Sequence, residues 1–276
     1  MSEWTAHLLT RAFIVAAVLL PLARADDDTG CIPNNPCYTA ASIANSAANI
    51  AGVYSPNSFI SIYGTNLANV TKPIGLSDIG SGMLPASLQG TGVGVLIAGI
   101  SGYIYYVSPN QVNVLIPENL TPGPVTVQLE NRGVYGPPVQ ITLAPTAPAL
   151  FQLDATNALA THGNGPLVTP QSPAVPGEIL VLYATGLGVT SPDTICGTLP
   201  QSAWPIADFA DFQVQLNGVA VDPKLIQYAG DTPGFAGLFQ INLQLPADCP
   251  PNPQIQIGFP NGLSTPGRYL PVQPPS

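Results

Sequence analysis

The sequence predicts an all-β protein built from two antiparallel β-sandwiches in tandem, behind a cleaved signal peptide. Three observations carry this prediction. The 276 residues include 27 glycines and 32 prolines, a content that is incompatible with long helices. Apolar and polar residues alternate over several short segments, as in strands with one buried face. Finally, the chain repeats itself in three blocks.

The first 25 residues have the three parts of a secretory signal peptide. Arg11 precedes an apolar run at 12–20, and Ala23 and Ala25 form an A-x-A cleavage pattern. The run is too short to span a bilayer comfortably, and nothing later in the chain is apolar enough to do so. An uncleaved N-terminal anchor is the alternative. We expect a secreted protein, in the periplasm or outside the cell.

All four cysteines follow this segment, and an even number in an exported chain indicates disulfides. Three pairings are open. We favour Cys31–Cys37 and Cys196–Cys249, because each pair then lies within one predicted domain. A metal site would need closer cysteine spacing or histidine partners, which the sequence lacks.

The internal repeat indicates two copies of one domain. Its blocks occur in the same order in both copies, with an expansion before the last block of the second copy. The matching segments are 56–67 with 176–187, 95–100 with 214–219, and 111–117 with 240–246.

Each block is typical of β-structure. Apolar residues alternate with polar ones at 111–117 and 125–130. Asn217-Gly218 favours a tight hairpin, with Ala98-Gly99 in the same place of the first copy. About seven strands per copy describe a sandwich. The predicted divisions are a signal peptide (1–25), an N-terminal segment with the disulfide loop and a first strand (26–54), and sandwiches at 55–147 and 148–276.

The joined blocks resemble a known family. The motifs are Tyr-Gly/Ala-Thr-x-Leu at 63–67 and 183–187, Tyr-Val-Ser-Pro-x-Gln-Val-Asn at 106–113, and Gly-Leu-Phe-Gln-Ile-Asn at 237–242. Together they look like the uncharacterised C-terminal domain family abundant in Acidobacteria of the Solibacter type. Each half is also similar to IPT/TIG immunoglobulin-like domains. The resemblance implies an exported β-sandwich protein and carries over no catalytic residues.

The inventory of catalytic side chains is short. His162 is the only histidine after the signal peptide, and its Gly-rich surroundings indicate a loop. No serine-hydrolase or zinc-protease motif occurs. A glycosidase-like carboxylate pair is the alternative, but the candidates lie beside turns or on polar strand faces, as solvated charges do. They are Glu118, Glu130, Glu178, Asp208 and Asp211.

A calcium site and a sugar-binding site are the two further candidates. Calcium suits an acidic exported sandwich, and Asp208 with Asp211, or Asp222 with Asp231, are the candidate ligands. Aromatic side chains bind sugars, and Tyr103, Tyr105 and Trp204 are the candidate ligand-binding residues. Strand alternation would place Tyr103 and Tyr105 on one face and Ile104 and Tyr106 on the other. We favour the interpretation that the tyrosines cover the sheet or seal the contact between the copies, with an exposed binding pair as the alternative. The repeated amides Gln111/Asn113 and Gln240/Asn242 are interpreted as structural.

The resulting hypothesis is a secreted, non-catalytic binding, adhesion or structural module. Its partner is unknown, with a polysaccharide or another exported protein as candidates. Nucleic acid is excluded by a net charge of −9 with six basic residues. No cofactor is implied. The alternative is a carboxylate-dependent polysaccharide-active enzyme that uses a cleft between the two copies, and an architectural spacer is a third account.

Overall fold

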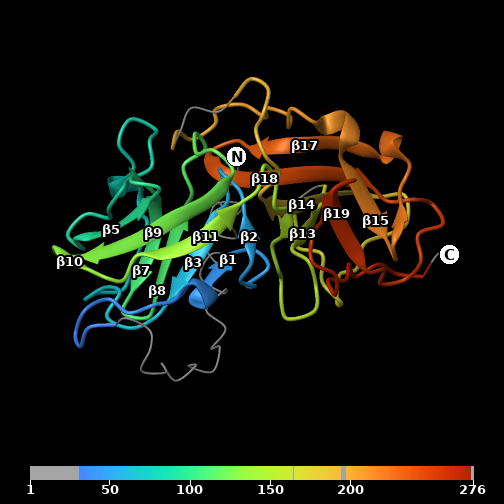
Figure 1. Ribbon diagram of the computed structural model, residues 1–276. Coiled ribbons are helices and arrows are strands. Elements are labelled where there is room, and N and C mark those ends of the chain that lie inside the picture. The colour runs from blue at the N-terminus through green and yellow to red at the C-terminus, as the bar shows by residue number, and fades with distance from the viewer. Residues whose placement is uncertain (1–30, 164, 194–196, 275–276) are drawn as a thin grey trace.

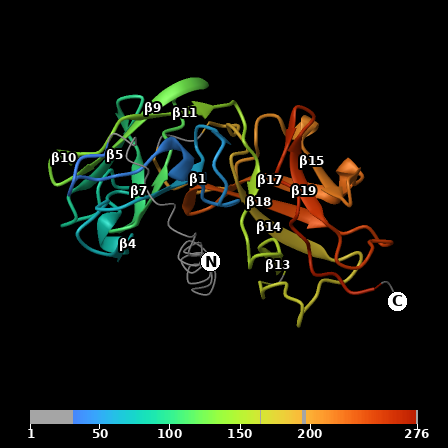
Figure 2. The same cartoon turned by 60° about the horizontal axis from the view of Figure 1, so that its bottom comes forward.

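The computed structural model describes residues 31–163, 165–193 and 197–274. In this part of the chain the regular elements are strands and four short 3-10 turns, so the predicted all-β class is confirmed. The strands form four sheets, two from the first half of the chain and two from the second. Figures 1 and 2 show the first half, β1–β11, on one side of the molecule and the second half, β12–β20, on the other.

The first half pairs two sheets around one apolar core. Sheet 1 has the strand order β1-β3-β8-β7-β4, and sheet 2 the order β2-β11-β9-β5-β6, with β10 beside β9. Ile60, Ile62, Val112 and Val114 point from sheet 1 into this core and are fully buried. The elements are β1 (Ile43–Asn45), β2 (Val53–Tyr54), β3 (Phe59–Tyr63), β4 (Lys72–Pro73), β5 (Val93–Ile97), β6 (Ile100–Ser101), β7 (Tyr103–Ser108), β8 (Gln111–Leu115), β9 (Gly123–Asn131), β10 (Val134–Tyr135) and β11 (Val139–Leu143), with turns η1 (Ala40–Ser42) and η2 (Leu76–Asp78).

The second half repeats this plan. Sheet 3 has the order β12-β14-β18-β17, with β13 beside β14, and sheet 4 the order β16-β15-β19-β20. Leu180, Leu182, Ile241 and Leu243 point into the second core. The elements are β12 (Ala149–Leu150), β13 (Ala160–His162), β14 (Ile179–Thr185), β15 (Gln213–Leu216), β16 (Val219–Ala220), β17 (Ile226–Thr232), β18 (Phe235–Gln244), β19 (Ile255–Phe259) and β20 (Gly262–Leu263), with turns η3 (Phe209–Asp211) and η4 (Pro223–Leu225).

Both predicted hairpins are present. Asn217 and Gly218 have φ of 51° and 78°, and Ala98 and Gly99 have φ of 52° and 79°. Each pair joins two antiparallel strands, β15 to β16 and β5 to β6. Two consecutive residues at positive φ match the right-handed twist of the flanking strands. The sheets are not antiparallel throughout, however, because β2 and β11 pair in parallel.

The predicted cysteine pairs differ in outcome. Cys31 and Cys37 form a disulfide, with their Cα atoms 5.3 Å apart. Cys249 is instead a free, buried cysteine, and its predicted partner Cys196 lies outside the described residues. The thiol donates to the Pro250 carbonyl at 3.6 Å, and burial raises its pKa to about 11. The predicted signal peptide also lies outside the described residues.

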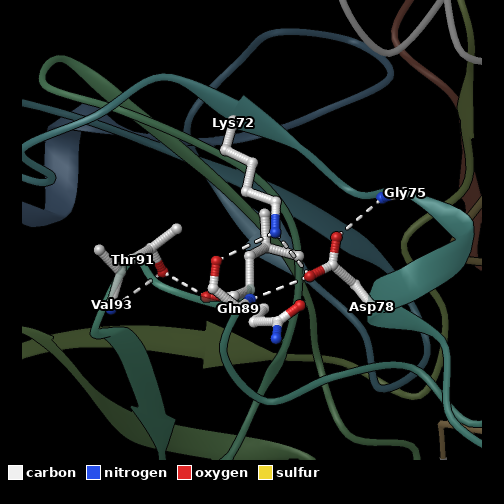
Figure 3. A network of polar contacts seen from close by, with 7 residues as sticks. Lys72, Gly75, Asp78, Gln89, Thr91 and Val93 are labelled. Carbon is white, nitrogen blue, oxygen red and sulfur yellow. Dashed lines mark hydrogen bonds and ion pairs between the residues drawn. The ribbon is translucent and has the colours of Figure 1, made fainter.

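A buried carboxylate holds the long connection between β4 and β5 (Figure 3). Lys72 Nζ donates to Asp78 Oδ1 at 2.7 Å, and the same oxygen accepts from the Gln89 N–H at 2.9 Å. Asp78 Oδ2 accepts from the Gly75 N–H at 3.0 Å. Burial disfavours the ionised form of Asp78, but these hydrogen bonds outweigh it and lower the pKa. Asp78 thus ties both ends of the connection to β4.

Replacing Asp78 with Asn is therefore expected to lower the free energy of unfolding by about 2 kcal/mol at pH 7, because a charged acceptor of three hydrogen bonds is lost. Urea unfolding measures this. Because the pKa of Asp78 is lowered on folding, the difference between variant and wild type should shrink as the pH falls below 3.8. Asp211→Asn, at an exposed carboxylate, is the control and should change stability by less than about 0.5 kcal/mol. Equal effects of both variants would contradict this role.

Candidate functional site on the facing sheets

The outer faces of sheets 1 and 3 meet in a third apolar cluster, which we call the seam. Phe59 and Leu115 are cross-strand partners on sheet 1, and Tyr183 and Leu238 come from sheet 3. The Phe59 N–H donates to Thr185 Oγ1 at 3.2 Å, from one half to the other. Since the cluster draws buried side chains from both sheets, the halves pack as one body.

Backbone hydrogen bonds extend the seam beyond the apolar cluster. The Leu84 N–H donates to the Gly197 carbonyl, and the Leu199 N–H to the Gly82 carbonyl, each at 2.8 Å. Tyr103 packs against Gly197, where a Cβ atom would lie 2.3 Å from the ring. The segment before η3 therefore pairs with the loop before β5.

Tyr103 and Tyr105 do not form the exposed pair that was the alternative interpretation; Tyr105 belongs to the seam cluster and Tyr103 packs against it. A bulge in β7 at Tyr105 breaks the alternation, so Tyr103 and Tyr106 share a face, opposite Leu115 and Asn113 respectively. Tyr105 is only 8% exposed, and its hydroxyl donates to the Ala236 carbonyl at 3.2 Å. These tyrosines lie at the seam.

Trp204, the third predicted aromatic residue, lies at the edge of sheet 3. It is half-buried, and its carbonyl accepts from the Asp231 N–H at 2.9 Å. The Tyr228 hydroxyl lies 2.9 Å from the same carbonyl and 2.9 Å from the Asp231 carbonyl. Through its backbone, Trp204 thus anchors the end of β17.

The repeated amides lie beside tyrosines in both halves. On sheet 1, Gln111 is opposite Tyr63 and Asn113 is opposite Tyr106. Gln111 Nε2 donates to Asn113 Oδ1 at 2.8 Å, and the two residues are 6% and 1% exposed. Directly opposite residues of an antiparallel pair point to the same face, so the four side chains form one set.

Sheet 3 carries the equivalent set. Gln240 is opposite Tyr183, and Asn242 is opposite Tyr228. Gln240 Nε2 lies 3.4 Å from Asn242 Oδ1, in the same donor–acceptor sense as in the first half. Here both amide residues are half-buried. The sequence interpretation found the amides but missed the tyrosines. Tyr63 and Tyr183 already recur in the repeat.

A cluster of carboxyl groups crosses the seam. Glu118 follows β8 in the first half, and Asp193 and Asp231 belong to the second. Burial, and then repulsion by Asp193 and Asp231, raise the pKa of Glu118 to about 7. Asp231 is fully buried. Burial, and then the charge of Asp231, raise the pKa of the neighbouring Tyr228 hydroxyl. Both halves therefore contribute negative charge to one place.

His162 also has partners that the sequence did not reveal. Its Nδ1 lies 2.6 Å from Glu178 Oε1, and its Nε2 lies 3.3 Å from Ser172 Oγ. The chain of contacts from Ser172 through His162 to Glu178 resembles a serine-hydrolase triad. The Ser172 N–H, however, is bonded to Thr169, and the next residue, Pro173, has no N–H. The backbone of Ser172 and Pro173 therefore offers no free N–H donor to stabilise an oxyanion beside the Ser172 hydroxyl.

The predicted calcium ligands come from η3, the start of η4 and the end of β17. Asp208 caps η3 and Asp211 ends it, and both are exposed; the Asp222 side chain accepts from the Lys224 N–H at 3.0 Å. Within the described ranges, no group of three or more His, Cys, Asp or Glu residues is arranged to hold a metal ion. The fourth candidate, Asp231, belongs to the carboxyl cluster at the seam.

No protein-family model matches the chain, and no curated protein matches it. Among solved structures it is similar to the Bacteroides ovatus mixed-linkage glucan utilization locus SGBP-B, in complex with a mixed-linkage heptasaccharide, at 11% identity and a TM-score of 0.33, covering 80% of this chain and 43% of that one. It is also similar to domains 5–6 of the S-layer protein SbsC, at 10% identity and a TM-score of 0.25, covering 88% and 100%. Tandem Ig repeats of Dlar match at 10% identity and a TM-score of 0.20, covering 80% and 92%.

The chain spans less than half the length of the first structures it matches. At these identities and TM-scores, the similarities are too low to assign a function, and the resemblance to the Acidobacteria family stays a prediction. Among the described residues, no helix is long and apolar enough to cross a membrane.

Proposed function

We propose that this chain is an exported, non-catalytic module that holds a polysaccharide or another exported protein against two rigidly docked β-sandwiches. The observation that carries the proposal is the seam, where apolar side chains and cross-half hydrogen bonds fix two sheet faces beside each other. A fixed pair presents a ligand with a preorganised surface, which lowers the entropic cost of binding. The Cys31–Cys37 disulfide supports an oxidising compartment.

The test is retention of the purified mature chain on insoluble cell-wall and plant polysaccharides, alongside capture of exported proteins on the immobilised chain. We expect concentration-dependent, saturable retention on at least one of these materials. An unrelated acidic protein at the same concentration serves as the control for non-specific adhesion. Retention on none of them would contradict a binding role and favour the spacer account.

A carboxylate-dependent polysaccharide-active enzyme is the second candidate, favoured by the pKa of Glu118, which burial and then repulsion by Asp193 and Asp231 raise to about 7. A carboxyl group that is partly protonated near neutral pH is suited to give a proton to a leaving oxygen. Asp231 is fully buried, which leaves Asp193 as the exposed carboxylate of the cluster. This account expects release of reducing ends from a polysaccharide, abolished in Glu118→Gln. Equal, background-level release by the wild type and the variant would exclude it.

A further inference from the structure

Sheet 3 presents a row of amide side chains that leads away from the seam. Along β18, Gln240, Asn242 and Gln244 alternate with the core residues Ile241 and Leu243 and are half-buried. Figure 1 shows β18 beginning beside the first half and running toward the far side of the second. The row is therefore a partly accessible polar face that continues the apolar seam.

Aromatic side chains flank this row on both neighbouring strands. Tyr183 on β14 is opposite Gln240, and Tyr228 on β17 is opposite Asn242. The Tyr228 hydroxyl is bound to backbone carbonyls at 2.9 Å, so its ring is held in place. Tyr228 is half-buried, which leaves part of its surface accessible.

The amides have hydrogen-bonding capacity that the protein does not use. In the Gln240–Asn242 contact, one Gln240 N–H faces Asn242 Oδ1 at a long 3.4 Å. Among the described residues, no hydrogen bond is found for Gln240 Oε1 or Asn242 Nδ2. An acceptor and a donor thus lie side by side next to a tyrosine ring.

The equivalent set in the first half is closed. Gln111 and Asn113 are 6% and 1% exposed, and Gln111 Nε2 donates to Asn113 Oδ1 at 2.8 Å. None of their amide atoms is among the buried side-chain atoms that lack a partner in the described residues. The first half therefore covers its amide pair, whereas the second half leaves the equivalent pair partly accessible.

We propose that the Gln240–Asn242 row with Tyr228 is a binding subsite for a neutral oligosaccharide; this inference rests on the proposed binding function. Sugar hydroxyls both donate and accept, which matches one free amide carbonyl beside one free amide nitrogen. The apolar face of a sugar ring packs on an aromatic ring such as that of Tyr228. The row itself has no charged side chain, which favours neutral over anionic sugars.

The test is isothermal titration of the full mature chain with neutral hexasaccharides of β-1,4-glucose, β-1,4-xylose and α-1,4-glucose, and with hexagalacturonate as the anionic comparison. We expect binding of at least one neutral hexasaccharide and at least tenfold weaker binding of hexagalacturonate. Asn242→Ala and Gln240→Ala should each weaken the neutral ligand at least tenfold. Gln215→Ala, at a half-buried glutamine on the outer face of sheet 4, is the matched control and should bind like the wild type.

Thermal unfolding of the same variants separates binding from a structural role, since partly accessible side chains should change the melting temperature little. If Asn242→Ala and Gln240→Ala bind the neutral hexasaccharide as tightly as the wild type, the subsite is overturned while the binding function stands. Retention on polysaccharides or exported proteins without binding of any hexasaccharide would also overturn the subsite alone. Absence of both kinds of binding would overturn the proposed function itself.

Discussion

Alanine at position 237 is expected to lower the free energy of unfolding by about 3 kcal/mol, because it strains the backbone and overfills the seam at once. Gly237 has a φ of 74°, where a side chain is disfavoured. Its added Cβ would lie 2.2 Å from Leu115 Cδ1 and 3.1 Å from Phe59 Cε2. Leu115 is 2% exposed, so its methyl group has little room to move away. Urea unfolding of the wild type and the variant measures the difference.

Gly218→Ala is the matched control for this substitution. Gly218 has a φ of 78°, but no atom lies within 4 Å of its added Cβ. Alanine there carries the backbone strain without the clash and should cost about 1 kcal/mol. Equal losses in both variants would mean that the seam tolerates the extra carbon and is not tightly packed.

The second large effect is a fall in stability as the pH rises, caused by Glu118. Burial and the carboxylates of Asp193 and Asp231 raise the pKa of Glu118 from 4.5 to about 7. Between these two values the folded chain binds more protons than the unfolded chain, so the free energy of unfolding decreases with rising pH. Above about pH 7 the loss from this group is complete.

Glu118→Gln is expected to remove this dependence and to be more stable than the wild type at pH 8, because the glutamine brings no charge to the seam. The measurement is the urea midpoint from pH 4.5 to 8. Asp208→Asn, at an exposed carboxylate before η3, is the control and should keep the slope of the wild type. A slope that is the same in Glu118→Gln and the wild type would refute the role of the cluster.

Local sequence patterns predicted the fold because the features that determine it are local. The Asn217-Gly218 turn and the alternation in β8 and β9 need only neighbouring residues to be recognised. Repetition of these patterns then indicated two copies. The parallel pairing of β2 with β11 joins strands far apart in the sequence, and no local pattern announces it.

The candidate site was predicted less well, since its contacts are non-local. The bulge at Tyr105 shifts the register of β7 against β8. Tyr106 therefore shares a face with Tyr103, where regular alternation had predicted Tyr105. Glu118 meets Asp193 and Asp231 only because the halves dock. Tyr106 and Tyr228 are 122 residues apart. This separation lies between the offsets that relate the second and the third repeat blocks of the two copies. An alignment of the copies with a gap in this interval would have paired the two tyrosines.

Hydrogen exchange at the Leu84, Leu199 and Phe59 amides tests most directly whether the two sandwiches are docked. Each of these N–H groups donates to an acceptor in the opposite half. If the seam is closed, all three should exchange as slowly as core amides of β8 and β18, with an opening free energy close to that of global unfolding. Exchange of all three at the rate of exposed loops, while the β8 and β18 amides stay protected, would show that the halves move independently and would contradict the account.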